Sequence, residues 1–282
     1  MDRLIGAHVS AAGGIYNAVK NADDFDINCF QIFASPPQRW SFKKPEEKDI
    51  QKFIADYKTS QQKAFYFHSI YLINLASEDK QKHHLAKMSL IDYLTLNNEL
   101  GGNGVITHIG TATGTTYEKA IENIRFGVNY VLEKTEKCSV PLILEVTAGT
   151  GNTIGSNFTH LKDIIEGVEN KDRIKVGFDS AHLYASGYDI VNDLENVLND
   201  FDKLVGLDKV ESVHLNDSKV GLNEKRDRHE NIGDGTIGAA GIKNLINNDR
   251  LKHLPFILET PGSKEDPAPG KSNIEFLKKN AR

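Results

Sequence analysis

The chain has 282 residues, of which 39% are hydrophobic and 26% charged, a composition typical of a globular protein with one large core. Its formal charge of −5 argues against a protein that binds nucleic acid through a uniformly basic surface. No apolar run approaches the roughly 18 residues needed to cross a bilayer, and the first residues do not form a signal peptide, so we expect a cytoplasmic protein.

Short apolar, β-branched segments alternate with longer segments of helical spacing along the whole chain. Strands are predicted at 4–8, 29–33, 64–68, 104–108, 142–145, 175–179, 212–215 and 255–259. Helices are predicted at 14–21, 45–61, 80–100, 117–137, 158–170, 189–201, 240–249 and 274–280. This alternation predicts parallel strands covered by helices, and eight βα units are typical of a closed (β/α)8 TIM barrel.

The expected fold class is therefore α/β, with a single TIM-barrel domain at 1–282, because no linker or change in composition divides the chain. An open doubly wound sheet is the alternative, but no glycine-rich dinucleotide turn follows the first strand. The longest irregular segment, 216–238, is charged and rich in glycine, which indicates a functional loop.

Side chains that bind metals stand at the carboxyl ends of seven predicted strands. They are His8, His68, His108, Glu145, Asp179, His214 and Glu259. One histidine at a strand end means little, but the carboxyl ends of barrel strands meet on one face, where such enzymes place their active sites. Seven such residues on that face predict a metal site.

The loops add three further candidates. His182 follows Asp179 by three residues, and Asp227 and His229 lie two apart in the long loop. Histidine and carboxylate without cysteine is typical of a hydrolytic zinc or manganese site. We set His8 aside as a substrate-contacting or supporting residue. The remaining nine candidate ligands suit three ions if one carboxylate bridges two of them, and such clusters act on phosphate esters. The alternative for Asp227 and His229 is a solvated run of charge.

Other reactive side chains receive structural interpretations. His83, His84, His160 and His253 lie in or beside helical segments and are interpreted as surface residues. Cys29 and Cys138 lie in or next to apolar segments, so we expect two buried thiols rather than a disulfide.

The motifs together resemble endonuclease IV, the second family of apurinic/apyrimidinic endonucleases. They are GAHVSAAGG (6–14), HSIYLINLAS (68–77), THIG (107–110), LEVTAG (144–149), FDSAHLYASGYD (178–189), HLNDSK (214–219), DRHENIGDG (227–235) and ILET (257–260). The similarity runs in unbroken order from the first strand to the eighth. It implies an endonuclease that hydrolyses the phosphodiester 5′ to abasic sites in double-stranded DNA, as in base excision repair.

The resemblance also implies a cofactor of three Zn²⁺ ions, with Mn²⁺ possible at one or more sites. His68 and His108 would hold the first ion, which Glu145 would bridge to a second held by Asp179, His214 and Glu259. His182, Asp227 and His229 would hold the third. Hydroxide flanked by the catalytic residues Glu145 and Glu259 would attack phosphorus, and the third ion would stabilise the departing 3′ oxygen. The products would be a 3′-hydroxyl and a 5′-deoxyribose phosphate.

The DNA contacts that the resemblance implies lie in the loops. Tyr71 and Leu72 match a wedge in the third loop that fills the gap left by a missing base, although from the sequence alone both would be assigned to the core. The second loop has Gln38 where the family has an arginine, and the neighbouring Arg39 is the candidate replacement. His8 is a further candidate contact. Three Zn²⁺ ions would change the charge of −5 to about +1.

Basic residues in these loops could face phosphates: Arg39, Lys43, Lys44, Lys219, Lys225, Arg226, Arg228 and Lys264. Other departures from the family are Val146 for Asn, Ile109 for Pro and Ala181 for Cys. None removes a ligand, although Val146 changes a residue beside the bridging carboxylate, where supporting hydrogen bonds matter.

Two other functions remain open at this point. Sugar isomerases and epimerases use a similar arrangement on related barrels, but they need only one or two ions and leave His182, Asp227 and His229 unexplained. A protein that binds damaged DNA without cutting it would be expected to have lost ligands, and all nine are present. We expect a monomer, because no large apolar stripe is left unassigned.

Overall fold

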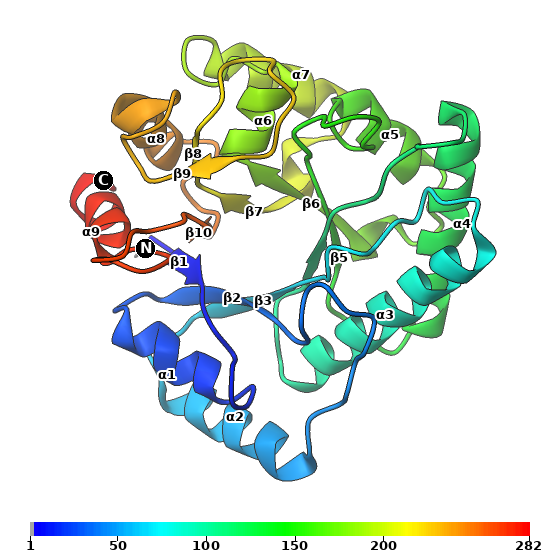
Figure 1. Ribbon diagram of the computed structural model, residues 1–282, viewed down its shortest axis with the longest axis horizontal. Coiled ribbons are helices and arrows are strands. Elements are labelled where there is room, and N and C mark those ends of the chain that lie inside the picture. The colour runs from blue at the N-terminus through cyan, green and yellow to red at the C-terminus, as the bar shows by residue number, and fades with distance from the viewer. Residues whose placement is uncertain (1–2) are drawn as a thin grey trace.

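The computed structural model describes residues 3–282, which form a closed barrel of eight parallel strands (Figure 1). The order around the barrel is β1-β10-β7-β6-β5-β4-β3-β2. The strands are β1 (Ile5–His8), β2 (Cys29–Phe33), β3 (Ala64–His68), β4 (Val105–Thr107), β5 (Leu142–Glu145), β6 (Ile174–Asp179), β7 (Val210–His214) and β10 (Phe256–Leu258). The predicted TIM barrel is confirmed.

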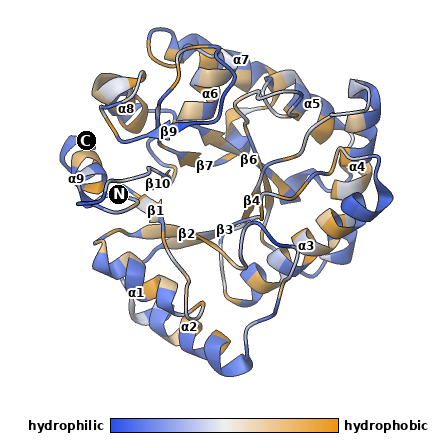
Figure 2. Ribbon diagram, in the orientation of Figure 1, coloured by the Kyte–Doolittle hydropathy of each residue, from blue (hydrophilic) through white to orange (hydrophobic). Residues whose placement is uncertain are grey.

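Helices surround the barrel and cover its outer face (Figure 1). They are α1 (Asn17–Asp24), α2 (Glu47–Thr59), α3 (Lys80–Glu99), α4 (Tyr117–Lys134), α5 (Phe158–Glu166), α6 (Ser180–Ser186), α7 (Leu194–Leu204), α8 (Gly238–Asn247) and α9 (Lys271–Asn280). Single 3-10 turns, η1 (Lys171–Arg173) and η2 (Leu207–Lys209), precede β6 and β7. Apolar residues on the helices face the strands, and polar residues face outward (Figure 2).

The barrel interior explains where the strand-end residues point. Tyr66, Ile106, Ile143 and Ile257 form a buried cluster with Cys29 and Ala64, separate from the core beneath the helices. Each of the first four lies two residues before His68, His108, Glu145 or Glu259. Alternate residues of a strand share one face. The polar side chains therefore occupy the next layer of the same interior, directly above an apolar plug.

The differences from the predicted helices include two helix starts and one short helix that was missed. The first helix begins at Asn17, not at 14, because Gly13 and Gly14 have φ angles of 81° and 142° that a helix does not allow. The helix predicted at 189–201 is α7, which begins at Leu194. The short α6 was not predicted; it begins directly after Asp179, whose side chain accepts a hydrogen bond of 2.8 Å from the backbone N–H of His182.

The long loop at 216–238 contains a two-stranded antiparallel sheet of β8 (Asp217–Ser218) and β9 (His229–Glu230). Within residues 3–282, no helix is long and apolar enough to cross a membrane.

Several structural interpretations of single residues need correction. Cys29 and Cys138 are free thiols as expected, but Cys138 is partly exposed rather than buried. His83 and His160 are half-buried rather than on the surface, because each contacts a neighbouring segment. His83 Nε2 lies 3.1 Å from the carbonyl oxygen of Asn123, and His160 Nδ1 accepts from the backbone N–H of Gly155. His84 and His253 are exposed, as interpreted from the sequence.

Candidate metal centre

Donor atoms of histidine, aspartate and glutamate converge at the carboxyl-terminal mouth of the barrel. Within residues 3–282 they form four overlapping groups, and in each group one donor atom per residue lies within 4.8 Å of the others. The groups are His68–His108–Glu145, Glu145–Asp179–His214–Glu259, His108–His182–Asp227 and Asp179–His182–His229. The fold thus brings together all nine candidate ligands, while metal binding by each of them stays a prediction.

Glu145 lies at the centre of these groups, fully buried at the end of β5. Its Oε2 lies 3.1 Å from Nε2 of both His68 and His108, and its Oε1 lies 2.9 Å from Nδ1 of His214. Burial alone would raise its pKa, but the imidazoles of His108 and His214 outweigh burial and hold the pKa of Glu145 well below its usual range. A carboxylate that stays ionised, with both oxygens facing ligand nitrogens, is suited to bridge two cations.

The loop residues Asp227 and His229 approach His182 at the edge of the mouth. Oδ1 of Asp227 lies 3.1 Å from Nε2 of His182 and 3.5 Å from Nε2 of His229. Among the described residues, carboxylate oxygens at 3.1 to 3.5 Å face these buried Nε2 atoms, but none is aligned to form a regular hydrogen bond with them. Buried polar atoms are rarely left without a partner, so the two nitrogens fit ligands of a metal ion. Imidazoles and carboxylates without a thiol suit Zn²⁺ or Mn²⁺.

Backbone carbonyls orient two of the imidazoles. Nδ1 of His68 lies 2.8 Å from the carbonyl oxygen of Ser69, and Nδ1 of His182 lies 2.9 Å from that of Val146. Because a carbonyl only accepts, each ring carries its proton on Nδ1 and turns Nε2 toward the centre. Val146 makes this contact through its backbone, so having valine in place of the family's asparagine leaves the contact intact.

Opposite charges dominate the electrostatics of the centre. Burial would lower the pKa of His182, but Asp179 and Asp227 raise it well above its usual value. Burial also opposes protonation of His214, yet Glu259 and Glu145 raise its pKa to about 9. The carboxylates therefore hold protons on the imidazoles when no other cation is present, and a metal ion that binds here must displace them.

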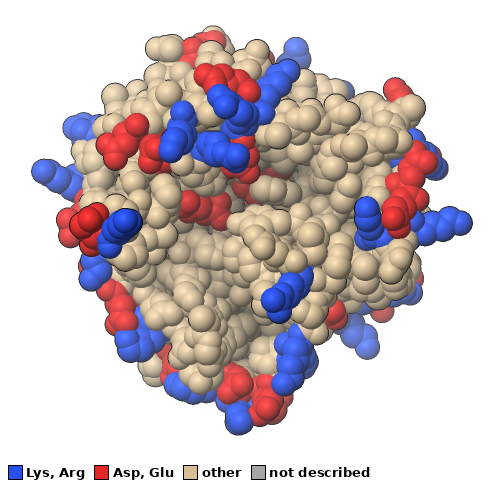
Figure 3. All heavy atoms as spheres, viewed as in Figure 1, with Lys and Arg blue, Asp and Glu red and all other residues tan. Residues whose placement is uncertain are grey.

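A pocket of about 560 Å³ opens above the centre. Its floor includes His68, His108, His182, Asp227, His229 and Glu259, and its walls include Phe33, Tyr71, Pro261, Ala268 and Pro269. Figure 3 shows this face hollowed near its middle, with acidic side chains at the bottom and a group of Lys and Arg side chains beside it, over β9 and the loop before it. The pocket thus combines ligand groups below with apolar walls above.

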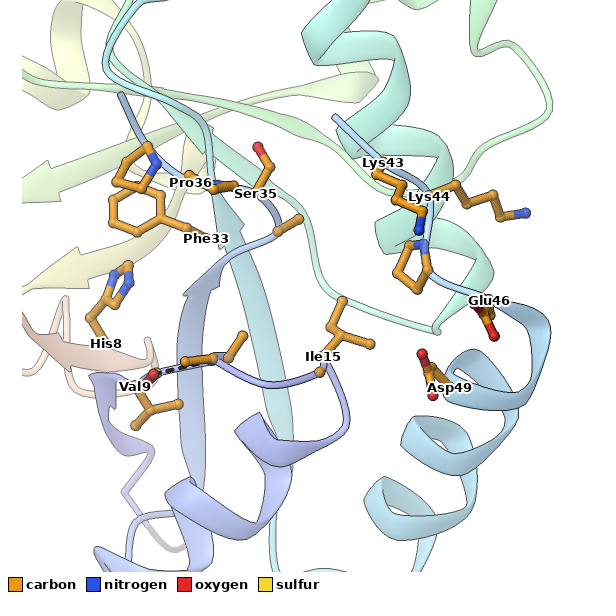
Figure 4. A pocket seen from close by; sticks show the side chains of 17 residues that line it. His8, Val9, Ile15, Phe33, Ser35, Pro36, Lys43, Lys44, Glu46 and Asp49 are labelled. Carbon is orange, nitrogen blue, oxygen red and sulfur yellow. Dashed lines mark hydrogen bonds between the residues drawn. The ribbon is translucent and has the colours of Figure 1, made fainter. Parts of the chain in front are cut away.

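A second cavity of about 690 Å³ lies next to the first, between the loops after β1 and β2 and the start of α2 (Figure 4). His8 and Phe33 line it on the side of the metal centre, with ring centroids 4.5 Å apart. Lys43 and Lys44 line the opposite side, and Lys44 forms an ion pair with Glu99. Of the two lysines, Lys43 is therefore the better candidate for a phosphate contact.

The residues predicted to probe DNA are exposed. Tyr71 and Leu72 are 58% and 37% exposed, which excludes the core assignment that the sequence alone would favour. Gln38 and Arg39 are also exposed, at the end of a turn closed by a hydrogen bond from the N–H of Arg39 to the carbonyl of Pro36. Their contact with DNA stays a prediction.

The loop that carries Asp227 and His229 is held by one buried carboxylate. Asp217, at the start of this loop, accepts hydrogen bonds from backbone N–H groups of Gly233, Gly235, Ile237 and Gly238. The basic residues Lys219, Lys225, Arg226 and Arg228 are exposed on the same loop, and Lys264 is exposed on the next.

Two further buried residues contact the candidate ligands and were missed from the sequence. The side-chain nitrogen of Asn216 donates to Asp179 Oδ2 at 2.8 Å, and its side-chain oxygen Oδ1 accepts from the backbone N–H of Glu259 at 2.7 Å. Gln31 contacts His8, His214 and Glu259. The available signal was a polar residue in the middle of an apolar strand, CFQIF at 29–33. His8 belongs to none of the four donor groups in the described chain, and its role beside a metal or a substrate stays a prediction.

The fold and this centre define a class of proteins. Residues 19–280 match the family described as the xylose isomerase-like TIM barrel. The same fold recurs in 3-keto-D-glucoside 4-epimerase from E. coli, with a TM-score of 0.71 over 99% of this chain and 100% of that one, but the two are only 14% identical, so this similarity concerns the fold alone.

Closer similarities distinguish one branch of that class. A probable endonuclease 4 from Halothermothrix orenii is 39% identical over 91% of this chain and 93% of its own length. The crystal structure of endonuclease IV from Thermus thermophilus superposes with a TM-score of 0.88 at 32% identity, over 99% of this chain and 100% of that one. The chain belongs to the endonuclease IV family.

Proposed function

We propose that this protein is a zinc-dependent DNA repair endonuclease that hydrolyses the phosphodiester 5′ to abasic sites, acting in the cytoplasm as a monomer. The observation that carries the proposal is a set of donors beyond those around Glu145: Asp227 Oδ1 lies 3.1 Å from His182 Nε2 and 3.5 Å from His229 Nε2. His182, Asp227 and His229 extend the centre beyond the sites formed around Glu145, as a phosphodiesterase with three ions requires. Family membership supports the same function.

The residues present fit three Zn²⁺ ions, with Mn²⁺ possible at one or more positions. His68, His108 and Glu145 would hold one, and Glu145, Asp179, His214 and Glu259 the second. His182 and His229 would hold the third together with Asp227, whose Oδ1 faces the Nε2 atom of each. When bound, such ions neutralise charge on a phosphodiester and lower the pKa of water toward neutrality.

Glu145 and Glu259 would have different roles in the reaction. Glu145 is completely buried among the donor groups, which suits a bridge between two ions, whereas the side chain of Glu259 is 18% exposed and lines the pocket. Glu259 is therefore placed to accept a proton from water that approaches a phosphate bound there. Hydrolysis that breaks the bond between phosphorus and the 3′ oxygen leaves a 3′-hydroxyl on one side and a 5′-deoxyribose phosphate on the other.

Recognition of the lesion would rest on the deformability of DNA rather than on reading bases. A nucleotide without a base has lost its stacking, so turning its sugar into the 560 Å³ pocket costs less than flipping an intact nucleotide. The exposed side chains of Tyr71 and Leu72 would occupy the space left in the helix. The pocket walls of Phe33, Pro261 and Pro269 offer apolar surfaces to a sugar ring.

The test is incubation of purified protein with a duplex that carries one tetrahydrofuran abasic analogue, together with metal analysis. We expect about three zinc ions per chain and a single incision 5′ to the analogue, with an undamaged duplex left intact. No incision by metal-replete protein would overturn the proposal. One tightly bound ion together with turnover of a ketose sugar would assign the protein to the isomerase branch instead.

A further inference from the structure

Gln31 lies in the middle of β2 and is fully buried, inside the barrel and directly beside the metal centre. In the sheet it is paired with His8 on β1 and with Tyr66 on β3. Its amide makes three contacts: Nε2 lies 2.6 Å from Glu259 Oε1 and 3.0 Å from Nδ1 of His8, and Oε1 lies 2.7 Å from Nε2 of His214.

The chemistry of the neighbours determines which end of the amide faces which side. An ionised carboxylate only accepts hydrogen bonds, so the atom 2.6 Å from Glu259 Oε1 must be the amide nitrogen. The opposite orientation would place the amide oxygen against that carboxylate and leave the nitrogen facing His214. The amide nitrogen has two hydrogens, so it can donate to Nδ1 of His8, 3.0 Å away, as well as to Glu259.

The amide oxygen accepts, so Nε2 of His214 must carry a hydrogen. The other ring nitrogen, Nδ1, lies 2.9 Å from Glu145 Oε1, 3.4 Å from Glu259 Oε2 and 3.8 Å from Asp179 Oδ2. It therefore faces the acidic donors that form the second site. A histidine that binds a metal through one nitrogen needs a partner for the other nitrogen, and Gln31 is that partner.

The amide acts in the opposite sense on His8. The amide nitrogen, 3.0 Å from Nδ1, is a nearer partner than Glu259 Oε1 at 3.6 Å, so we expect the neutral ring of His8 to accept from the amide and to carry its hydrogen on Nε2. The ring lines both the pocket above the metal centre and the neighbouring cavity, where Figure 4 shows it beside Phe33. An N–H donor on that wall is suited to the oxygen of a phosphate or a sugar.

We propose that Gln31 is a positioning residue that sets the tautomers of two histidines at once, presenting Nδ1 of His214 to metal and the Nε2–H of His8 to substrate. The same amide fixes Glu259 between them. This inference rests on the proposed function for the nature of the metal and substrate, but the tautomers themselves do not depend on which reaction the centre catalyses.

The direct test uses the unmodified protein. Long-range ¹⁵N–¹H correlation spectra of the zinc-loaded chain, labelled with ¹⁵N-histidine, distinguish Nδ1–H from Nε2–H rings. We expect His214 to be Nε2–H with Nδ1 bound to metal, and His8 to be Nε2–H. A His214 ring protonated on Nδ1, or a His8 ring protonated on Nδ1, would overturn the proposal without any variant having to fold.

Gln31→Met removes all three hydrogen bonds at nearly constant length and shape. We expect zinc to be lost to a chelator on the order of 10- to 100-fold faster, because loss of a ligand's supporting partner has that effect. The His8 ring should become a mixture of tautomers. On abasic DNA, kcat should fall more than KM rises. Zinc release within about twofold of the parent, with unchanged His8 tautomer, would contradict the proposal.

The matched control is Gln62→Met. Gln62 is also buried, but its amide donates to Asp23 and to the carbonyl of Ile27, outside the metal centre. This variant should be less stable to heat, with zinc release and His8 tautomer unchanged. If the parent protein shows the expected tautomers and zinc release but cuts no abasic DNA, the proposed function fails and the role of Gln31 stands.

Discussion

The backbone N–H of Tyr71 donates a hydrogen bond of 3.0 Å to the carbonyl oxygen of Pro37. This bond joins the third loop of the barrel to the second. Gln38 and Arg39 follow Pro37 directly, so the two loops predicted to probe DNA are held as one unit beside the pocket. The position of one loop therefore depends on the other.

Replacing both Tyr71 and Leu72 with alanine should weaken incision without affecting the metal centre. Both side chains are exposed, so zinc content and unfolding temperature should stay unchanged. We expect kcat/KM on abasic duplex to fall about 10- to 100-fold, since a stacked aromatic side chain contributes roughly 1–3 kcal/mol. The control is Phe126→Ala on α4, which removes an equally exposed aromatic ring, 59% exposed. Equal effects of the two changes would contradict the wedge.

Arg39→Ala should weaken binding to abasic duplex more than Gln38→Ala does. Gln38 occupies the position of the family's arginine, but only Arg39 can offer a guanidinium to stack on a base or to contact phosphate. We expect the affinity for abasic duplex to fall about 5- to 20-fold in Arg39→Ala and less than threefold in Gln38→Ala. The loss of affinity in Arg39→Ala should be larger at low salt than at high salt. Fluorescence anisotropy with a labelled duplex measures both. A larger effect at Gln38 would mean that Arg39 does not replace the missing arginine.

Glu259→Gln should keep the fold and DNA binding but abolish cleavage. The amide is the same size as the carboxylate but cannot accept a proton from water. Single-turnover cleavage should fall on the order of 10²- to 10⁴-fold, the range of a lost general base. Circular dichroism and anisotropy should match the parent when metal content is kept equal. Retained cleavage would remove Glu259 from its proposed role.

Asp217→Ala should loosen the loop that brings Asp227 and His229 to the centre. The change leaves several backbone N–H groups without an acceptor. We therefore expect the free energy of unfolding, measured with denaturant, to fall by about 3 kcal/mol. Bound zinc should fall by about one ion per chain. Asp234→Ala, an exposed carboxylate of the same loop, is the control and should change neither quantity. A full complement of zinc in Asp217→Ala would show that the loop holds its shape by other contacts.

Glu211→Gln should stabilise the protein more at pH 8 than at pH 5. Burial raises the pKa of Glu211, which accepts a hydrogen bond from the hydroxyl of Tyr66 at 3.2 Å. The folded protein thus disfavours the ionised form. That cost is absent at a pH low enough to protonate both states, and it grows as the pH rises through the pKa of the folded state. Glutamine has no such cost. We expect the unfolding temperature of Glu211→Gln to exceed that of the parent by about 1–2 °C at pH 8. Glu275→Gln, on the surface of α9, should show no such dependence on pH.

The barrel and the convergence of the candidate ligands could be predicted because both leave a mark along the sequence. Strands alternate with helices, and candidate ligands such as His68 and Glu145 end apolar strands. What could not be predicted depends on contacts between distant segments. Gln31 has no periodic signal, and only the closed barrel places it between His8 and His214. The helix α6 was missed because it begins at Ser180, directly after Asp179 and within the motif assigned to metal binding, so no gap separates strand from helix.

The order of strands around the barrel has a consequence for synthesis of the protein. The last strand, β10, lies between β7 and β1, so the barrel cannot close until β10 is in place. Glu259 follows that strand directly. A nascent chain on the ribosome can therefore have His68, Glu145 and Asp179 in place and still lack both a closed wall and the final carboxylate. If these residues bind metal as proposed, we expect the full set of ions to bind only after the whole barrel has been translated, so that an incomplete chain would be inactive.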